Sequence, residues 1–109
     1  MDYNTKATLF KALAHPVRLQ ILDMLRHGEI CVCHIERALN KRQAYVSQQL
    51  MYLREQQIVD SRKDGLQVYY RIVALDIEKI LAVGLGAKDS DFPIYLDDCP
   101  CPSCQTELA

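Results

Sequence analysis

The five cysteines of this 109-residue chain fall into two clusters, Cys31 with Cys33 and Cys99 with Cys101 and Cys104. A buried structural cysteine behaves as a small hydrophobe, but three thiols in an acidic, proline-interrupted segment have no core to fill. Soft thiolates select zinc, cadmium, lead and trivalent arsenic over hard cations. The two clusters therefore predict that the thiols bind a soft metal or metalloid.

The spacing of the cysteines does not decide how many sulfurs bind one ion. Arsenite favours three sulfurs, which Cys99, Cys101 and Cys104 supply from one short loop, whereas zinc and cadmium favour four tetrahedral ligands. Cys31 and Cys33 either join that triad, within one subunit or across a dimer, or form a second site. Residues two apart on a regular helix point about 200° apart, so these two thiols share an ion only where the chain is non-helical. We expect the tail triad to be required for sensing.

Length and composition place the thiols in one small domain. No apolar run approaches the length of a bilayer span, and the N-terminus lacks the basic-then-apolar order of a signal peptide. Thiols at close spacing in a reducing compartment indicate metal binding or redox chemistry rather than structural bridges. We therefore expect a cytoplasmic protein without a membrane partner, with one domain over residues 1–87 and an acidic, cysteine-rich tail over 88–109.

The central segment that follows Cys31 and Cys33 has the pattern of two short helices joined by a polar turn. Residues 33–39 form the first helix and 40–42 the turn, where Asn40 suits left-handed geometry. From Gln43 onward, apolar residues at helical spacing face a core. The opposite face carries no acid; it consists of Ala44, Tyr45, Ser47, Gln48 and Tyr52. Helix, turn and helix in this order are typical of DNA-binding proteins whose second helix enters the major groove.

Charge and a predicted β-hairpin support the same interpretation. The net charge is −1, but residues 37–71 hold seven basic and three acidic side chains, a net of +4, as phosphate binding requires. Residues 58–62 and 66–72 are rich in β-formers around Lys63-Asp64-Gly65, and Asp-Gly is a strong hairpin signal. A hairpin directly after a reading helix is the wing of a winged helix, and Arg62, Lys63 and Arg71 would carry its charge.

Helices are also predicted near both ends of the domain, over residues 5–14 and 76–85. A further helix starts at Pro16, because the residue before proline avoids helical geometry and makes His15 a helix-junction residue. The apolar stripes of the two terminal helices have little to cover inside so small a domain. We therefore expect a homodimer that presents two reading helices to successive major grooves.

These residues together resemble the ArsR/SmtB family of metal-responsive repressors. The resemblance covers about residues 5–85 and rests on four motifs in order. They are Leu13-Ala14-His15-Pro16-Val17-Arg18-Leu19-Gln20-Ile21-Leu22, Glu29-Ile30-Cys31-Val32-Cys33, Val46-Ser47-Gln48-Gln49-Leu50 with Leu53, and Arg62-Lys63-Asp64-Gly65 with Tyr69-Tyr70-Arg71. The family implies a mainly helical, homodimeric winged helix-turn-helix with a small β-hairpin, which represses an operon until a toxic metal binds.

The second motif is similar to that of the arsenite- and cadmium/lead-sensing branches, where thiolates at the start of the first helix of the helix-turn-helix bind the inducer. Two positions depart from the family pattern. Glu36 stands where the arsenite branch usually has a further cysteine, so that helix does not hold three thiols. Gln49 stands where a histidine is common. The helix over 76–85 also contains no histidine, so we expect this chain to lack the zinc site that some relatives carry on their last helix.

We predict a non-enzymatic repressor that binds double-stranded operator DNA without a cofactor. Its inducer would be As(III) or Sb(III), or else Cd(II), Pb(II) or Zn(II), bound by Cys31, Cys33, Cys99, Cys101 and Cys104. The residues expected to contact DNA are Lys41, Arg42, Gln43, Tyr45, Ser47, Gln48, Arg62 and Lys63.

Two alternatives keep the thiols but change their role. The first is a repressor of the same fold that senses thiol oxidation, and the second is a thiol metal buffer, which leaves the acid-free helix face and the wing unexplained. Cys101-Pro-Ser-Cys104 has the spacing of a redox disulfide, but a thiol oxidoreductase needs a βαβ fold around it. His34, next to Cys33, could add a nitrogen ligand, although a solvent-exposed helix position is the favoured interpretation.

Overall fold

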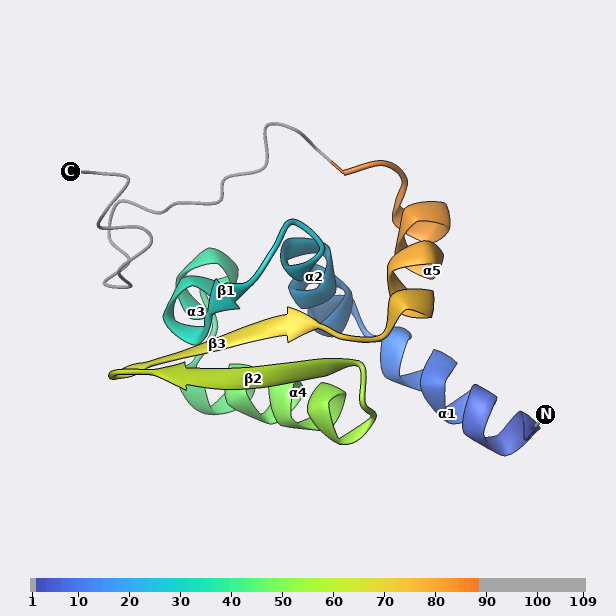
Figure 1. Ribbon diagram of the computed structural model, residues 1–109, viewed down its shortest axis with the longest axis horizontal. Coiled ribbons are helices and arrows are strands. Elements are labelled where there is room, and N and C mark those ends of the chain that lie inside the picture. Colours follow the sequence, from blue (N-terminus) through green and yellow to red (C-terminus); the bar gives the residue numbers. More distant parts are fainter. Residues whose placement is uncertain (1, 89–109) are drawn as a thin grey trace.

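The computed structural model describes residues 2–88, which form five helices and a small antiparallel sheet (Figure 1). The helices are α1 (Tyr3–Leu13), α2 (Pro16–Leu25), α3 (Val32–Leu39), α4 (Gln43–Glu55) and α5 (Leu75–Leu85), and the strands are β1 (Ile30–Cys31), β2 (Val59–Asp64) and β3 (Gln67–Ile72). Helices α3 and α4, followed by the β2–β3 hairpin, confirm the predicted winged helix-turn-helix. In this part of the chain no helix is both long enough and apolar enough to cross a bilayer.

The sheet has three strands in the order β1-β3-β2, one more than the sequence predicts. Strand β1 contains two residues, too few for a periodic pattern, and it pairs Ile30 with Tyr70 and Cys31 with Tyr69. The hairpin loop lies one residue later than predicted, because Asp64 still pairs with Gln67. Of the two loop residues, only Gly65 has positive φ, at 62°, as a type II′ turn requires.

The core lies where α2 and α3 pack on β3 and α4 packs on β2, with α4 also against α2 and α3 (Figure 1). The predicted inner stripe of α4, which consists of Val46, Leu50 and Leu53, is fully buried. Ile21 and Ile35 reach it from the two preceding helices. Truncating one such side chain to alanine costs about 2–5 kcal/mol, so the core fixes the position of α4.

Local sequence sets the ends of the helices. Helix α1 begins before the predicted residue 5 because the Asp2 carboxylate accepts from the Asn4 N–H at 3.0 Å and from the Thr5 hydroxyl at 2.6 Å. His15 caps α2 as expected of a junction residue, since its Nδ1 accepts from the Val17 N–H at 3.2 Å. Asn40 ends α3 with φ 52° and ψ 46°, the left-handed geometry predicted for the turn.

The terminal helices leave apolar surface exposed. Helix α1 projects from the body of the domain, and α5 runs beside the end of β3 (Figure 1). Between them lies a cavity of about 300 Å³, which we call the terminal groove; it is lined by Phe10, Leu13, Ala14, Leu19, Ile80, Leu81, Gly84 and Leu85. Leu81 is nevertheless a core residue, 2% exposed, whereas Phe10 is 56% exposed. The predicted stripes are therefore partly core and partly open surface.

Candidate nucleic-acid interface and thiol pair

Helix α4 presents the predicted polar face away from the core. Ala44 and Gln48 are exposed, and Tyr45 and Ser47 are partly exposed on the same side. A broad hollow of about 740 Å³ runs along this face from Arg42 to Glu55. Glu55, which the sequence analysis did not place on this face, adds an acid at its C-terminal end. The acid-free part is therefore the N-terminal half of α4, the part that reads base edges in helix-turn-helix proteins.

Tyr52, also assigned to the outer face, has a structural contact. The Arg18 guanidinium lies 4.2 Å from the centroid of its ring. Arg18 Nε also donates to Gln49 Oε1 at 3.1 Å, and its Nη1 donates to the Ala12 carbonyl at 3.1 Å. Gln49, which stands where the family often has histidine, thus anchors the arginine that ties α1 and α2 to α4.

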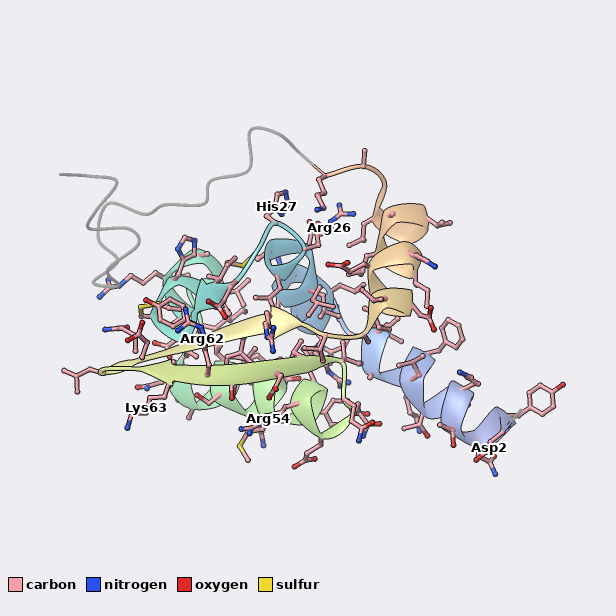
Figure 2. All side chains as sticks on the ribbon, viewed as in Figure 1. Asp2, Arg26, His27, Arg54, Arg62 and Lys63 are labelled. Carbon is pink, nitrogen blue, oxygen red and sulfur yellow. A yellow bond between two sulfur atoms is a disulfide. The ribbon has the colours of Figure 1, made fainter. Side chains whose placement is uncertain are left out.

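The two basic residues of strand β2 have different surroundings. Successive residues of a strand point to opposite faces of a sheet, and Figure 2 shows Arg62 and Lys63 on opposite sides of the wing. Arg62 makes a two-pronged ion pair with Glu29, with N–O distances of 2.6 and 2.9 Å, and lies over the Tyr69 ring at 4.7 Å. Hydrogen bonding to Glu29 raises the pKa of Arg62. Lys63, in contrast, is exposed on the other side of the wing.

Cys31 and Cys33 meet because the chain changes conformation between them. Cys31 ends β1 and caps α3 with extended geometry, φ −78° and ψ 152°, so the condition of a non-helical chain is met. The two Sγ atoms form a disulfide, with the Cα atoms 5.5 Å apart. Cys31 is 2% exposed and its Sγ accepts from the His34 N–H at 3.4 Å. The two sulfurs are therefore bonded to each other at the start of α3.

Cys33 faces the wing. Its Sγ lies 3.4 Å from Oε1 of Gln67, the first residue of β3. Both residues line a cavity of about 300 Å³ between α3, α4 and the hairpin, which we call the wing cavity; its lining includes Val32, Cys33, Glu36, Gln43, Ser47 and Gln67. Burial raises the pKa of Glu36, and the neighbouring Arg37 opposes that shift. Cys33 thus lines the same cavity as Gln43 and Ser47, two residues of the predicted reading helix.

His34 corrects one expectation of the sequence analysis. The favoured interpretation made it a solvent-exposed helix residue, but it is 2% exposed. It lies in the first turn of α3 beside Ile35, on the side that packs into the domain. His34 is therefore a buried neighbour of the thiol pair and not a surface residue.

The predicted metal ligands divide into two groups. Cys31 and Cys33 are brought together, and as thiolates they fit the first two ligands of a soft metal. Cys99, Cys101 and Cys104, with the predicted tail from Asp89 onward, lie outside the described residues. Within residues 2–88 no three or more histidine, cysteine, aspartate or glutamate side chains gather into a metal site.

The arrangement of α3, α4 and the β2–β3 hairpin, with the polar outer face of α4, is that of a winged helix-turn-helix protein. Residues 15–61 match the family described as "Bacterial regulatory protein, arsR family". The chain is 37% identical over 89 residues to the cadmium resistance transcriptional regulatory protein CadC of Listeria innocua, covering 81% of this chain and 75% of that protein. The chain belongs to the ArsR family, which confirms the resemblance. The family and the fold are those of DNA-binding transcriptional regulators and not of enzymes.

Two further relatives extend the comparison. The biofilm growth-associated repressor of Agrobacterium fabrum is 47% identical over 66 residues, which cover 61% of this chain and 56% of that protein. The chain thus matches little more than half the length of this relative. The solution structure of the homodimeric winged helix-turn-helix DNA-binding domain Mb0332 from Mycobacterium bovis superimposes with a TM-score of 0.70 at 35% identity, covering 76% of this chain and 77% of that one.

Proposed function

We propose that the protein represses transcription as a homodimer on double-stranded operator DNA in the cytoplasm, and that the state of the Cys31–Cys33 pair sets its DNA affinity. The observation that carries this proposal is the meeting of the two sulfurs at the start of α3, where Cys33 contacts the wing through Gln67. Any ligand of the sulfurs therefore acts on the helix that supports α4 and on the hairpin. DNA binding itself needs no cofactor.

In this proposal α4 enters the major groove. Gln43, Tyr45, Ser47 and Gln48 lie on its N-terminal, acid-free face and reach base edges, whereas Lys41, Arg42 and Lys63 reach phosphates. These three cations are exposed, which supports the assignment. Arg62 contacts phosphate only by exchanging Glu29 for it, since its guanidinium already holds that carboxylate.

A second copy of the chain covers the terminal groove in this proposal. The groove is apolar and lies between the two helices whose stripes predict dimerisation. Mb0332, which has the same fold, is described as homodimeric. A two-fold dimer would repeat α4 at the spacing of successive major grooves, so that each half-site adds to the other.

The inducer we propose first is a soft metal or metalloid: As(III) or Sb(III), or else Cd(II), Pb(II) or Zn(II). Reduced Cys31 and Cys33 supply two thiolates, and Cys99, Cys101 or Cys104 supplies the further sulfur that these ions favour. CadC, a relative, is named for cadmium resistance. A metal shifts the DNA equilibrium only by its differential affinity for the two states, and couplings of about 1–3 kcal/mol are typical.

A second candidate is favoured by the disulfide between Cys31 and Cys33. Oxidation would remove the hydrogen that a Cys33 thiol can donate to Gln67 Oε1, 3.4 Å away. It would also lock the junction of β1 and α3. In this form of the switch the two described cysteines suffice, and the tail thiols are accessory.

One experiment separates these candidates. Operator affinity is measured by fluorescence anisotropy for the reduced chain alone, with arsenite, with cadmium, and after oxidation followed by removal of the oxidant. The same series is run on Cys31→Ser with Cys33→Ser and on a triple serine variant at 99, 101 and 104. We expect metal-induced release to fail in both variants. If only oxidation releases the DNA, and still does so in the triple variant, the oxidation switch would replace the metal switch. If metal and oxidant release DNA from the double variant as they do from the parent, the proposal would be overturned.

A further inference from the structure

We propose that small thiols and disulfides exchange with the Cys31–Cys33 pair at Cys33 alone, through the wing cavity, with Cys31 as the buried partner sulfur. This site would accept a low-molecular-weight aminothiol, a compound that carries a thiol and an ammonium group. The inference rests on the proposed thiol switch, because it names the point at which that switch meets its redox partner.

The two sulfurs differ in access. Cys31 is 2% exposed and is enclosed where β1 pairs with β3, opposite Tyr69. Cys33 is partly exposed and lines the wing cavity. Thiol–disulfide exchange requires a thiolate to reach the sulfur that it attacks, so rates depend on access as well as on nucleophilicity. An external thiolate therefore meets Cys33 first.

The exchange balances with the aminothiol as its only co-reactant. A thiolate of the small molecule attacks Cys33 Sγ and forms a mixed disulfide, and the bond between the two protein sulfurs breaks. Cys31 leaves with the electron pair as a thiolate, and its Sγ already accepts the His34 N–H at 3.4 Å. A second small thiolate then attacks the small-molecule sulfur of the adduct, which frees Cys33. The protein disulfide and two thiols give the dithiol and one small disulfide.

The lining of the wing cavity selects the charge of the small molecule. Its volume of about 300 Å³ is at the lower limit for ligand pockets, so it suits a compound of a few heavy atoms beyond the sulfur. Glu36 is the charged residue in its lining, and Gln43, Ser47 and Gln67 add neutral polar groups. A carboxylate favours an ammonium group over a hydroxyl or a second carboxylate at the same position.

An adduct on Cys33 would lie between the wing and the reading helix. Ser47 and Gln43, which belong to the proposed DNA-reading face, share the cavity with Cys33. A group attached to this sulfur thus occupies space beside α4 directly. The mixed disulfide would weaken DNA binding before the second exchange step restores the dithiol.

The test compares two single-thiol chains, both made in full-length protein with serine at 99, 101 and 104. Cys31→Ser leaves Cys33 alone and keeps a side chain that caps helices well. Cys33→Ser leaves Cys31 alone, and Cys33→Ala is its second version. Reaction with cystamine is followed by intact mass, and circular dichroism checks that each chain is folded. We expect Cys33 to react at least about tenfold faster than Cys31 in folded protein, and within about twofold in concentrated urea, where burial is lost.

A charge comparison tests the assigned ligand class. In the Cys33 chain, cystamine should react faster than bis(2-hydroxyethyl) disulfide by about threefold or more after correction for their intrinsic rates with free cysteine. Glu36→Gln should abolish this preference, and Glu78→Gln on α5 is the matched control that should keep it. Equal rates at the two cysteines in folded protein would overturn the site, and a preference that survives Glu36→Gln would overturn the ligand class. Neither result touches the thiol switch, which fails only if operator affinity ignores the state of the pair.

Discussion

The wing cavity and the terminal groove have similar volumes, about 300 Å³ each, and opposite chemistry. The wing cavity contains a sulfur, a carboxylate, amides and a hydroxyl, brought together from α3, α4 and β3. The terminal groove is lined almost entirely by aliphatic and aromatic side chains from the helices near the two ends of the domain. Volume alone therefore does not distinguish the two cavities, but their lining does.

This difference supports the partner that we propose for each cavity. Apolar burial is non-directional and roughly proportional to area, so the terminal groove suits the broad surface of a second copy. Polar groups and a partly exposed sulfur suit directed contacts with a small ligand that binds and dissociates. In the proposed function, lasting assembly and exchangeable signalling would therefore use separate cavities, and α4 lies on the side of the wing cavity.

The largest expected effect is at the terminal groove. Phe10→Glu places a carboxylate on a groove residue that is 56% exposed, so the monomer should stay folded while the dimer dissociates. Affinity for a palindromic operator should fall by about 100-fold, because linked half-sites lose their mutual contribution. Sedimentation velocity and anisotropy measure the two effects. Leu66→Glu, at the exposed hairpin loop, is the matched control for sedimentation, and a dimeric Phe10→Glu chain would place the interface elsewhere.

The next effect concerns sequence preference and is confined to α4. Gln48→Ala should lose about 1–3 kcal/mol of discrimination between operator and random DNA, because a bidentate base contact is removed. Lys63→Ala should weaken both DNAs alike and reduce the salt dependence by about one counterion. Competition binding at several salt concentrations measures both. Unchanged preference in Gln48→Ala would show that the reading face lies elsewhere on the helix.

A smaller effect is expected where the wing meets the segment before Cys31. Glu29→Gln frees Arg62 from its ion pair, in which the two side chains are 28% and 51% exposed. DNA affinity should rise by less than about fivefold, since exposed pairs are worth only about 0.2–1 kcal/mol. Asp64→Asn, which removes a longer contact of 3.5 Å to Arg62, should raise it less. A fall in affinity in Glu29→Gln would mean that the pair holds the wing in its DNA-binding position.

The smallest effect is a pH dependence in the wing cavity. Burial raises the pKa of Glu36 in the folded chain, so its contribution to stability is complete at low pH and is lost as pH rises through that raised pKa. Glu36→Gln should therefore be slightly more stable than the parent at neutral pH, and the difference should close as the solution becomes acidic. Urea unfolding at several pH values measures this, with Glu78→Gln as the exposed control. If the stability difference between Glu36→Gln and the parent grew toward low pH, the raised pKa of Glu36 would be contradicted.

Much of the shape of α4 and of its outer face could be predicted because both depend on local periodicity. The buried stripe of Val46, Leu50 and Leu53 follows from helical spacing, and so does the face that carries Ser47 and Gln48 opposite it. The turn at Asn40 and the cap at His15 were likewise set by the preferences of single residues. Strand β1 was missed because two residues show no period, and the hairpin loop was misplaced by one residue because Asp64 stays in the ladder.

Contacts between residues that are distant in sequence could not be predicted from a local pattern. Glu29 and Arg62 are 33 residues apart, and Cys33 and Gln67 are 34 apart, so neither contact could be read from spacing. Both depend on β1 pairing with the wing strand. The sequence by itself determined the winged helix, the polar outer face of α4 and the presence of neighbouring thiols, because each rests on side-chain type and a short-range period. Only the tertiary structure decided that Arg62 is paired with Glu29, that His34 is buried and that Cys33 contacts the wing, because packing brings distant segments together.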